Sequence, residues 1–319
     1  MKLGLFTALL SEMPLDAVIR LVQPLGIQAL EFSTGNYGRP AHIDLGLAAN
    51  NVAAKEFKTK LDDQGFEISA LNCAGNVLHP TSEIAKTHIE TCRQTILLAE
   101  VLGIRTVINF SGCPGDSENS KYPNFVSTSW PPDYLEILKW QWEEKVLPFW
   151  TEHIKFAADH GVRIALEMHP GFVVYSPETL LRLREQVGVN LGCNLDPSHL
   201  FWQGIDPCQA VRALGPAILH VHAKDTKIYP ANASLNGTLD TKPYGDEQRR
   251  SWLFRTVGYG HGPDFWSDFV STLEMIGYDH VLSMEHEDSL MSVEDGLAKG
   301  ANFLNQWLIK EKLKSIWWT

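Results

Sequence analysis

Four short apolar runs decide the fold of this chain: Arg163-Ile-Ala-Leu-Glu167, Val189-Asn-Leu-Gly-Cys-Asn-Leu-Asp196, Ala217-Ile-Leu-His-Val-His222 and His280-Val-Leu-Ser-Met-Glu285. Each is rich in aliphatic or β-branched side chains, a pattern typical of a buried parallel strand. Each also ends in a side chain that can bind a metal: Glu167, Asp196, His222 and Glu285. Burying such groups is costly unless something compensates them. We therefore expect these four side chains to converge on one divalent cation.

The rest of the chain repeats the same alternation of strand and helix patterns. Four earlier strands are predicted at residues 2–6, 27–32, 66–71 and 104–110. Helices are predicted from residue 14 and at 47–64, 81–102, 134–160, 177–186, 206–214, 263–276 and 293–312. Eight strand–helix units without a linker predict an α/β protein with a (β/α)8 TIM barrel as a single domain over residues 1–319. The active site of such a barrel lies at the carboxyl ends of its strands, where the four side chains stand.

An open, doubly wound sheet is the competing architecture. It would carry a Gly-x-Gly-x-x-Gly turn after its first strand, and this chain has none there. A segment at about residues 225–260 is longer than the other connections and is predicted to be a loop insertion. Loops of that length often form lids or subunit contacts, so the segment allows for a homo-oligomer.

Composition excludes several classes of function. The chain has 319 residues, of which 44% are hydrophobic and 20% are charged, as in ordinary globular proteins. The net charge of -11, with acids spread along the chain, argues against a nucleic-acid surface. The five cysteines include no Cys-x-x-Cys pair, which argues against a disulfide framework or a structural zinc site.

No apolar run approaches the roughly 20 residues that span a bilayer, and no signal-peptide cleavage pattern follows the start. We therefore expect a cytoplasmic protein with no membrane partner.

The predicted ligands suit a hard or borderline divalent ion, because they comprise three carboxylates and one imidazole. We expect Mn²⁺ in the first place, with Mg²⁺, Co²⁺ or Zn²⁺ as alternatives. Each ligand taken alone has a structural alternative, such as capping a helix or bonding to an arginine. Four candidates in succession at predicted strand ends favour a metal site.

These residues resemble a known family. Glu167, Asp196-Pro-Ser-His199, His222-Ala-Lys-Asp225 and Glu285 are similar to the metal-site pattern of the xylose isomerase-like TIM barrel superfamily. This superfamily includes sugar phosphate isomerase/epimerases, ketose 3-epimerases and endonuclease IV, and the resemblance covers nearly the whole chain. It implies a metal-dependent isomerase or epimerase acting on a small sugar or sugar derivative.

In the ketose 3-epimerases, two metal-bound glutamates act as acid and base on opposite faces of a substrate carbon. The resemblance places Glu167 and Glu285 in these catalytic roles, with the reaction passing through an enediolate. A proton next to a carbonyl is removable only when the resulting negative charge is stabilised, and a cation can do this directly. The base must also lie within hydrogen-bond reach of the proton.

Four further residues are candidates for substrate binding. His199 resembles the substrate-binding histidine of the family, although a helix-start histidine bonded to backbone is the structural alternative. His169 follows Glu167 by two residues and is predicted to act as a substrate ligand or an extra acid or base. The arginine that the epimerases carry beyond the histidine ligand is missing here, so Lys224 or Arg255 is the predicted positive donor. Two other histidines are predicted to be structural: His79 and His261.

Two other functions stay open at this point. A lyase or hydratase acting on keto-sugars or keto-glycosides, including C-glycoside cleavage, begins with the same proton removal. A catalytically inactive sugar-binding barrel predicts an incomplete metal site. Endonuclease IV is disfavoured by the acidic balance and because Trp252, Leu253 and Phe254 stand where that enzyme has an Asp-x-His pair.

Overall fold

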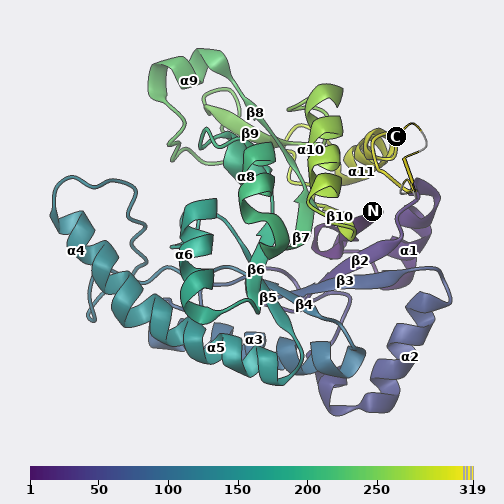
Figure 1. The fold of residues 1–319 in the computed structure, drawn as a ribbon, viewed down its shortest axis with the longest axis horizontal. Helices are drawn as coiled ribbons and strands as arrows, with labels where there is room; N and C mark the ends of the chain where they lie inside the picture. The colour runs from purple at the N-terminus through teal and green to yellow at the C-terminus, as the bar shows by residue number, and fades with distance from the viewer. Residues whose placement is uncertain (312, 314, 317, 319) are drawn as a thin grey trace.

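Eight parallel strands form a closed barrel in the computed structural model, which describes residues 1–311, 313, 315, 316 and 318 (Figure 1). The barrel strands are β1 (Lys2–Phe6), β2 (Ala29–Ser33), β3 (Glu67–Asn72), β4 (Thr106–Asn109), β5 (Arg163–Glu167), β6 (Leu191–Leu195), β7 (Ile218–Ala223) and β10 (Val281–Met284). They follow one another around the barrel in chain order, and β10 closes it against β1. The predicted (β/α)8 fold is confirmed.

Helices follow the strands and pack outside the barrel (Figure 1). They are α1 (Leu15–Val22), α2 (Asn51–Asp62), α3 (Ser82–Leu102), α4 (Asp133–Trp140), α5 (Leu147–Asp159), α6 (Pro177–Val187), α7 (Ser198–Phe201), α8 (Pro207–Leu214), α10 (Pro263–Met275) and α11 (Val293–Leu304). Among the described residues, none of these helices combines enough length with enough apolar character to cross a membrane.

Two predicted helices differ from the structure. The helix predicted at 134–160 is interrupted by a π-helical turn at Gln141–Val146. Pro148 has no N–H to donate to the carbonyl four residues earlier, so the regular hydrogen-bond ladder cannot run through this point. The last helix ends at Leu304 rather than at residue 312, which lies outside the described residues. The chain turns there, and the Asn305 side chain donates a 3.0 Å hydrogen bond to the Leu25 carbonyl.

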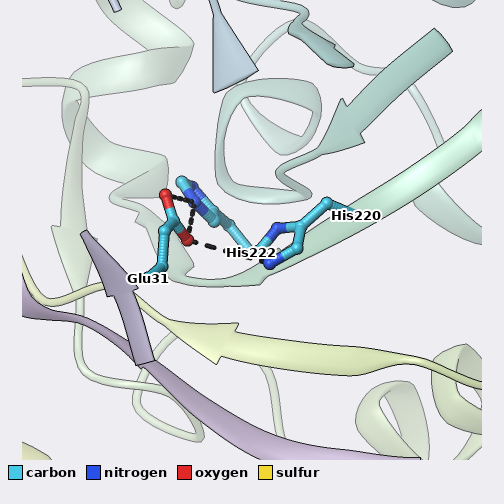
Figure 2. Close-up of side chains that lie close together, drawn as sticks. All are labelled: Glu31, His220 and His222. Carbon is cyan, nitrogen blue, oxygen red and sulfur yellow. Dashed lines mark hydrogen bonds and ion pairs between the residues drawn. The ribbon is translucent and has the colours of Figure 1, made fainter. Parts of the chain in front are cut away.

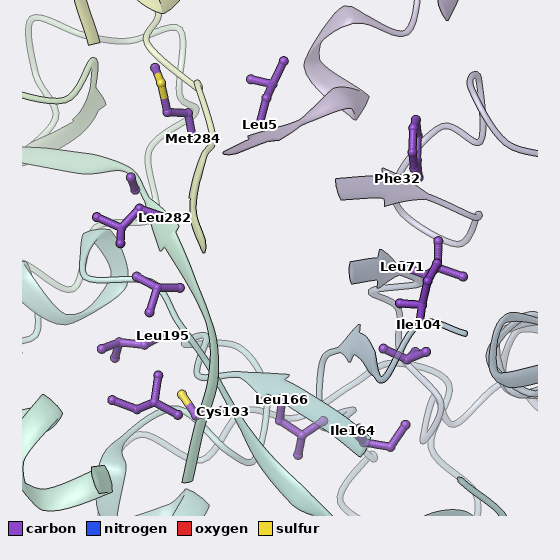
Figure 3. Packing of buried hydrophobic residues seen from close by; sticks show 14 of the residues in the cluster. Leu5, Phe32, Leu71, Ile104, Ile164, Leu166, Cys193, Leu195, Leu282 and Met284 are labelled. Carbon is purple, nitrogen blue, oxygen red and sulfur yellow. The ribbon is translucent and has the colours of Figure 1, made fainter. Parts of the chain in front are cut away.

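The hydrophobic core lies mainly between the barrel and its helices. Figure 3 shows strand side chains such as Leu5, Phe32 and Leu166 directed away from the barrel axis, and all three are fully buried. A second, smaller cluster is formed by residues that alternate with these along the strands: Ala70, Ile108, Ala165 and Leu219. The alternation of side chains along each strand explains why both faces of the strands are apolar near the base of the barrel.

The segment at 225–260 is not a structureless loop. It contains an antiparallel pair of strands, β8 (Asp225–Ile228) and β9 (Trp252–Arg255), with α9 (Pro230–Asn236) between them (Figure 1). The carboxylate of Asp225 closes the base of this insertion by accepting hydrogen bonds from three backbone N–H groups, those of Gly258, Gly260 and His261. The insertion packs on the barrel through an aromatic cluster: Trp202, Trp252 and Phe254.

Gly192 on β6 provides a test of barrel packing. A Cβ at this position would lie 2.4 Å from the Ala217 carbonyl oxygen and 2.5 Å from Leu219 Cγ. Because backbone cannot move aside cheaply, we expect Gly192→Ala to lower the free energy of unfolding by about 1–3 kcal/mol or more, measured by denaturant titration. Gly245→Ala is the control, since a Cβ there meets nothing within 4 Å. Equal stability of the two variants would contradict the close packing described here.

Candidate metal centre

The structure brings the four predicted ligands together at the carboxyl ends of their strands. Glu167 ends β5, Asp196 follows β6, His222 lies near the end of β7 and Glu285 follows β10. Each offers one ligand atom, and these atoms all lie within 4.8 Å of one another. Parallel strands in a closed barrel deliver their ends to one rim, so side chains far apart in sequence meet there. We call these four residues the ligand cluster.

Several buried atoms of the ligand cluster have close charged neighbours but make no well-formed hydrogen bond. His222 Nδ1 lies 3.3 Å from Glu167 Oε2 and 3.0 Å from Glu285 Oε2. Nevertheless, His222 Nδ1, Glu285 Oε2 and Asp196 Oδ2 have no hydrogen bond in acceptable geometry to any described residue. An unsatisfied buried polar group costs about 1–3 kcal/mol. A cation bound among these atoms would satisfy all of them, so the residues present fit a metal ion.

The electrostatics of the cluster also fit a cation. Burial raises the pKa of Glu167 to about 8, and the negative charges of Glu285 and Asp196 add to this effect. Burial likewise raises the pKa of Asp196. For Glu285, burial acts in the same direction, but Lys224 and His222 outweigh it and hold the pKa of this carboxyl well below its usual range. Three crowded carboxylates of this kind are stabilised by positive charge between them.

The two predicted positive donors differ in position. The Lys224 side chain is only 2% exposed, and its Nζ lies 3.2 Å from Asp196 Oδ2 and 2.9 Å from Glu285 Oε2. It therefore stands at the edge of the ligand cluster. Arg255 instead donates from Nε to Asp288 Oδ2 at 3.0 Å and contacts the Tyr229 hydroxyl. Among the described residues that line the pocket over the cluster, Arg255 is absent.

Both predicted substrate-binding histidines lie beside the ligand cluster. His199 Nε2 is 3.2 Å from Glu167 Oε1 and 3.3 Å from Asp196 Oδ2, and neither ring nitrogen has a hydrogen bond to a described residue. The backbone-bonded alternative for His199 is thus not what the structure shows. The His169 ring centroid is 4.0 Å from that of His199. Burial lowers the pKa of His169 to about 4, which favours its neutral form.

A pocket of about 510 Å³ lies above the cluster. Its polar lining includes Glu167, His169, His222 and Glu285, and its aromatic lining includes Phe6, Tyr37 and Phe110. A space of this size, with convergent polar groups on apolar walls, suits a small molecule. The two histidines predicted to be structural lie outside this lining: His79 accepts from the Thr81 backbone N–H, and His261 pairs with Asp225.

Sequence reasoning missed two residues near the site. Glu31 on β2 is fully buried, and its carboxylate contacts His222 Nε2 at 3.0 and 3.1 Å (Figure 2). Its signal was available, because a charged residue inside the apolar run Ala29–Ser33 needs a partner. Arg39 also lines the pocket, but it lies in an irregular connection. The sequence around it does not distinguish it from other surface arginines.

Comparison with known proteins agrees with the barrel fold. Residues 19–307 match the family model described as xylose isomerase-like TIM barrel. The protein YfiH of Bacillus subtilis (strain 168) is 40% identical over 310 residues, which cover 96% of this chain and 99% of that protein.

Two solved structures have the same fold. The probable 3-DHS dehydratase AsbF of Bacillus anthracis has a TM-score of 0.65 at 19% identity, over 96% of this chain and 99% of that one. A D-tagatose 3-epimerase-like protein has a TM-score of 0.65 at 22% identity, over 96% of this chain and 97% of that one. At these identities, the likeness concerns the fold.

Proposed function

Because this chain belongs to the xylose isomerase-like TIM barrel family, we propose that it is a metal-dependent enzyme acting on a small sugar or sugar derivative. The reaction is an isomerisation or epimerisation, in which a proton is removed from and returned to carbon next to a carbonyl. One observation carries the proposal: four ligand atoms lie within 4.8 Å of one another beneath a pocket of suitable size. Two of these ligands are carboxylates that line the pocket, Glu167 and Glu285.

Glu167, Asp196, His222 and Glu285 would hold one divalent cation, for which we propose Mn²⁺ ahead of Mg²⁺, Co²⁺ or Zn²⁺. When bound, the ion supplies Lewis-acid stabilisation of negative charge on substrate oxygens. Since all four ligands are present and close together, the arrangement favours an enzyme over an inactive sugar-binding barrel. Metal analysis of the purified protein separates these two alternatives.

The protein side chains divide the remaining tasks. Glu167 and Glu285 act as the acid and base that take a proton from the substrate carbon and return one. His199 and His169 bind substrate oxygens beside them. Lys224 keeps the neighbouring carboxylates charged through its contacts with Asp196 and Glu285.

Solvent exchange tests the proposed reaction. We expect metal-loaded enzyme in D₂O to introduce deuterium next to the carbonyl of a suitable ketose without breaking the molecule. The measurement is NMR with mass spectrometry on a panel of free and phosphorylated ketoses. Chelator-treated protein is the control and should give no exchange. Absence of exchange across the panel, from protein that carries its metal, would count against proton transfer on these sugars.

A second candidate is a dehydratase or another lyase acting on a keto-sugar derivative. It is favoured by the paired rings of His169 and His199 beside Glu167, since elimination needs neighbouring groups that bind the departing oxygen. The fold shared with a probable 3-DHS dehydratase points the same way. The D₂O incubation distinguishes the two reactions, because elimination yields a dehydrated or cleaved product, whereas isomerisation or epimerisation keeps every heavy atom and changes the mass only by the deuterium taken up.

A further inference from the structure

We propose that Glu31 is a positioning residue that selects the tautomer and orientation of His222 and thereby raises the affinity of the ligand cluster for its cation. The inference rests on the proposed metal-dependent function. Glu31 lies on β2 and His222 on β7, so the carboxylate reaches its partner through the interior of the barrel (Figure 2).

The two nitrogens of the His222 ring face different partners. Nε2 lies 3.1 Å from Glu31 Oε1 and 3.0 Å from Oε2, while Nδ1 faces Glu167 and Glu285 in the ligand cluster. A carboxylate can only accept, so Nε2 must carry the proton that it donates to Glu31. In a neutral imidazole, this leaves the lone pair on Nδ1, the atom that points to the cation position.

Glu31 is itself held in place by two neutral donors. Asn72 Nδ2 donates to Oε1, and Ser283 Oγ donates to Oε2, each at 2.8 Å. These partners come from β3 and β10, and all the groups are buried. The ring of Phe6 on β1 stacks on His222, with centroids 5.8 Å apart and an interplanar angle of 21°. Four strands besides β7 thus fix one imidazole, and a group held this firmly binds a ligand at a smaller entropic cost.

A second cation among Glu31, His220 and His222 is a different interpretation of the same cluster. The existing contacts of His220 disfavour it. Its Nδ1 lies 2.9 Å from Asn194 Oδ1, and its Nε2 lies 3.3 Å from Ser69 Oγ, so both ring nitrogens already have partners. The carboxylate of Glu31 is likewise engaged by three side chains. His220 instead supports the ligand cluster by a separate route, because Asn194 contacts His220 through Oδ1 and donates from Nδ2 to Glu167 Oε2 at 2.8 Å.

Metal titration of chelator-treated full-length protein tests the inference. Mn²⁺ and Zn²⁺ affinities are measured by calorimetry for wild type, Glu31→Gln, Ser283→Ala and Asp240→Asn. We expect Glu31→Gln to weaken binding about 10–100-fold, since it removes the negative charge that increases ligand basicity. Ser283→Ala should cause a smaller loss. Asp240→Asn is the control, because the hydrogen bonds of this carboxylate to described residues stay within the insertion, with Ser251 and Lys242, and the substitution should leave affinity unchanged.

The possible failures are distinguishable. If wild type binds no divalent ion, the proposed function is wrong. If wild type binds and Glu31→Gln binds equally well, only the role of Glu31 is overturned. Should Glu31→Gln unfold, Ser283→Ala decides the question, because unchanged affinity in that variant would overturn the inference.

Nitrogen-15 NMR of the zinc-loaded protein checks the tautomer directly. We expect the proton of His222 on Nε2 and the chemical shift of a metal-bound nitrogen on Nδ1. A zinc-loaded wild type with the proton on Nδ1 would also overturn the role of Glu31.

Discussion

Glu285→Gln is expected to lower turnover by at least about 10³-fold while leaving the fold intact. An amide cannot take up the proton that a general base removes, and a positioned acid or base contributes about 10²–10⁴-fold to a rate. The substitution also removes one charged ligand of the cluster. The measurement is steady-state kinetics at saturating metal, so that reduced metal affinity does not account for the loss of kcat. Circular dichroism and a thermal melt verify the fold.

Glu287→Gln is the matched control for this experiment. Glu287 lies two residues further along the chain and contacts Lys224 Nζ at 3.0 Å, but its side chain is 51% exposed and is not part of the ligand cluster. Glu287 lines the pocket but offers no ligand atom to the cluster, so we expect a much smaller loss than in Glu285→Gln. Activity retained in Glu285→Gln, or lost equally in both variants, would rule out the acid–base role of Glu285.

The barrel could be predicted from the sequence because its strands are buried on both faces. Such strands appear as short continuous apolar runs, and their alternation with helical patterns leaves few architectures to consider. The run at Arg163–Glu167 was predicted with the bounds that the structure shows. The ligand cluster was predicted by the same reasoning, because polar residues at the carboxyl ends of the barrel strands all lie on the same rim.

Tertiary contacts explain what the sequence did not predict. The insertion between Asp225 and Gly260 gains its two-stranded sheet from pairing over a long separation, such as Asp225 with Arg255. Arg255 was predicted to bind the substrate, and this pairing brings its side chain beside Asp288. Neither partner is recognisable from local pattern, since the residues are far apart in the chain.

The role of Glu31 depended on a contact across the barrel. Its position in an apolar strand indicated that it needs a partner, but the partner lies on β7, which does not neighbour β2. Strand order alone therefore does not identify His222. Glu31 and His222 meet because both side chains point into the barrel. Which side chains point inward depends on the register of the strands as well as on their order.

Lys224→Met is expected to destabilise the metal-free protein by about 3–5 kcal/mol. Nζ of Lys224 lies within 3.2 Å of carboxylate oxygens of Asp196 and Glu285, and removing one partner from a buried group of charges leaves the others uncompensated. Methionine preserves much of the volume of the apolar stem, so lost packing contributes little. The free energy of unfolding is measured by denaturant titration of chelator-treated protein.

Adding a divalent cation should reverse part of this loss, because the ion replaces the missing positive charge. A ligand at a free concentration of 100 times its dissociation constant stabilises a folded protein by about 2.7 kcal/mol. The site of the variant is more negative, so it should bind the ion more tightly than wild type does. We therefore expect a larger metal-induced stabilisation in Lys224→Met than in wild type. Lys299→Met is the control, since it removes an exposed pair with Asp295 and a contact with the Tyr259 ring, and should change stability far less than Lys224→Met does. If the two variants were equally stable without metal, Lys224 would not be the counter-charge that keeps the carboxylates of the ligand cluster together.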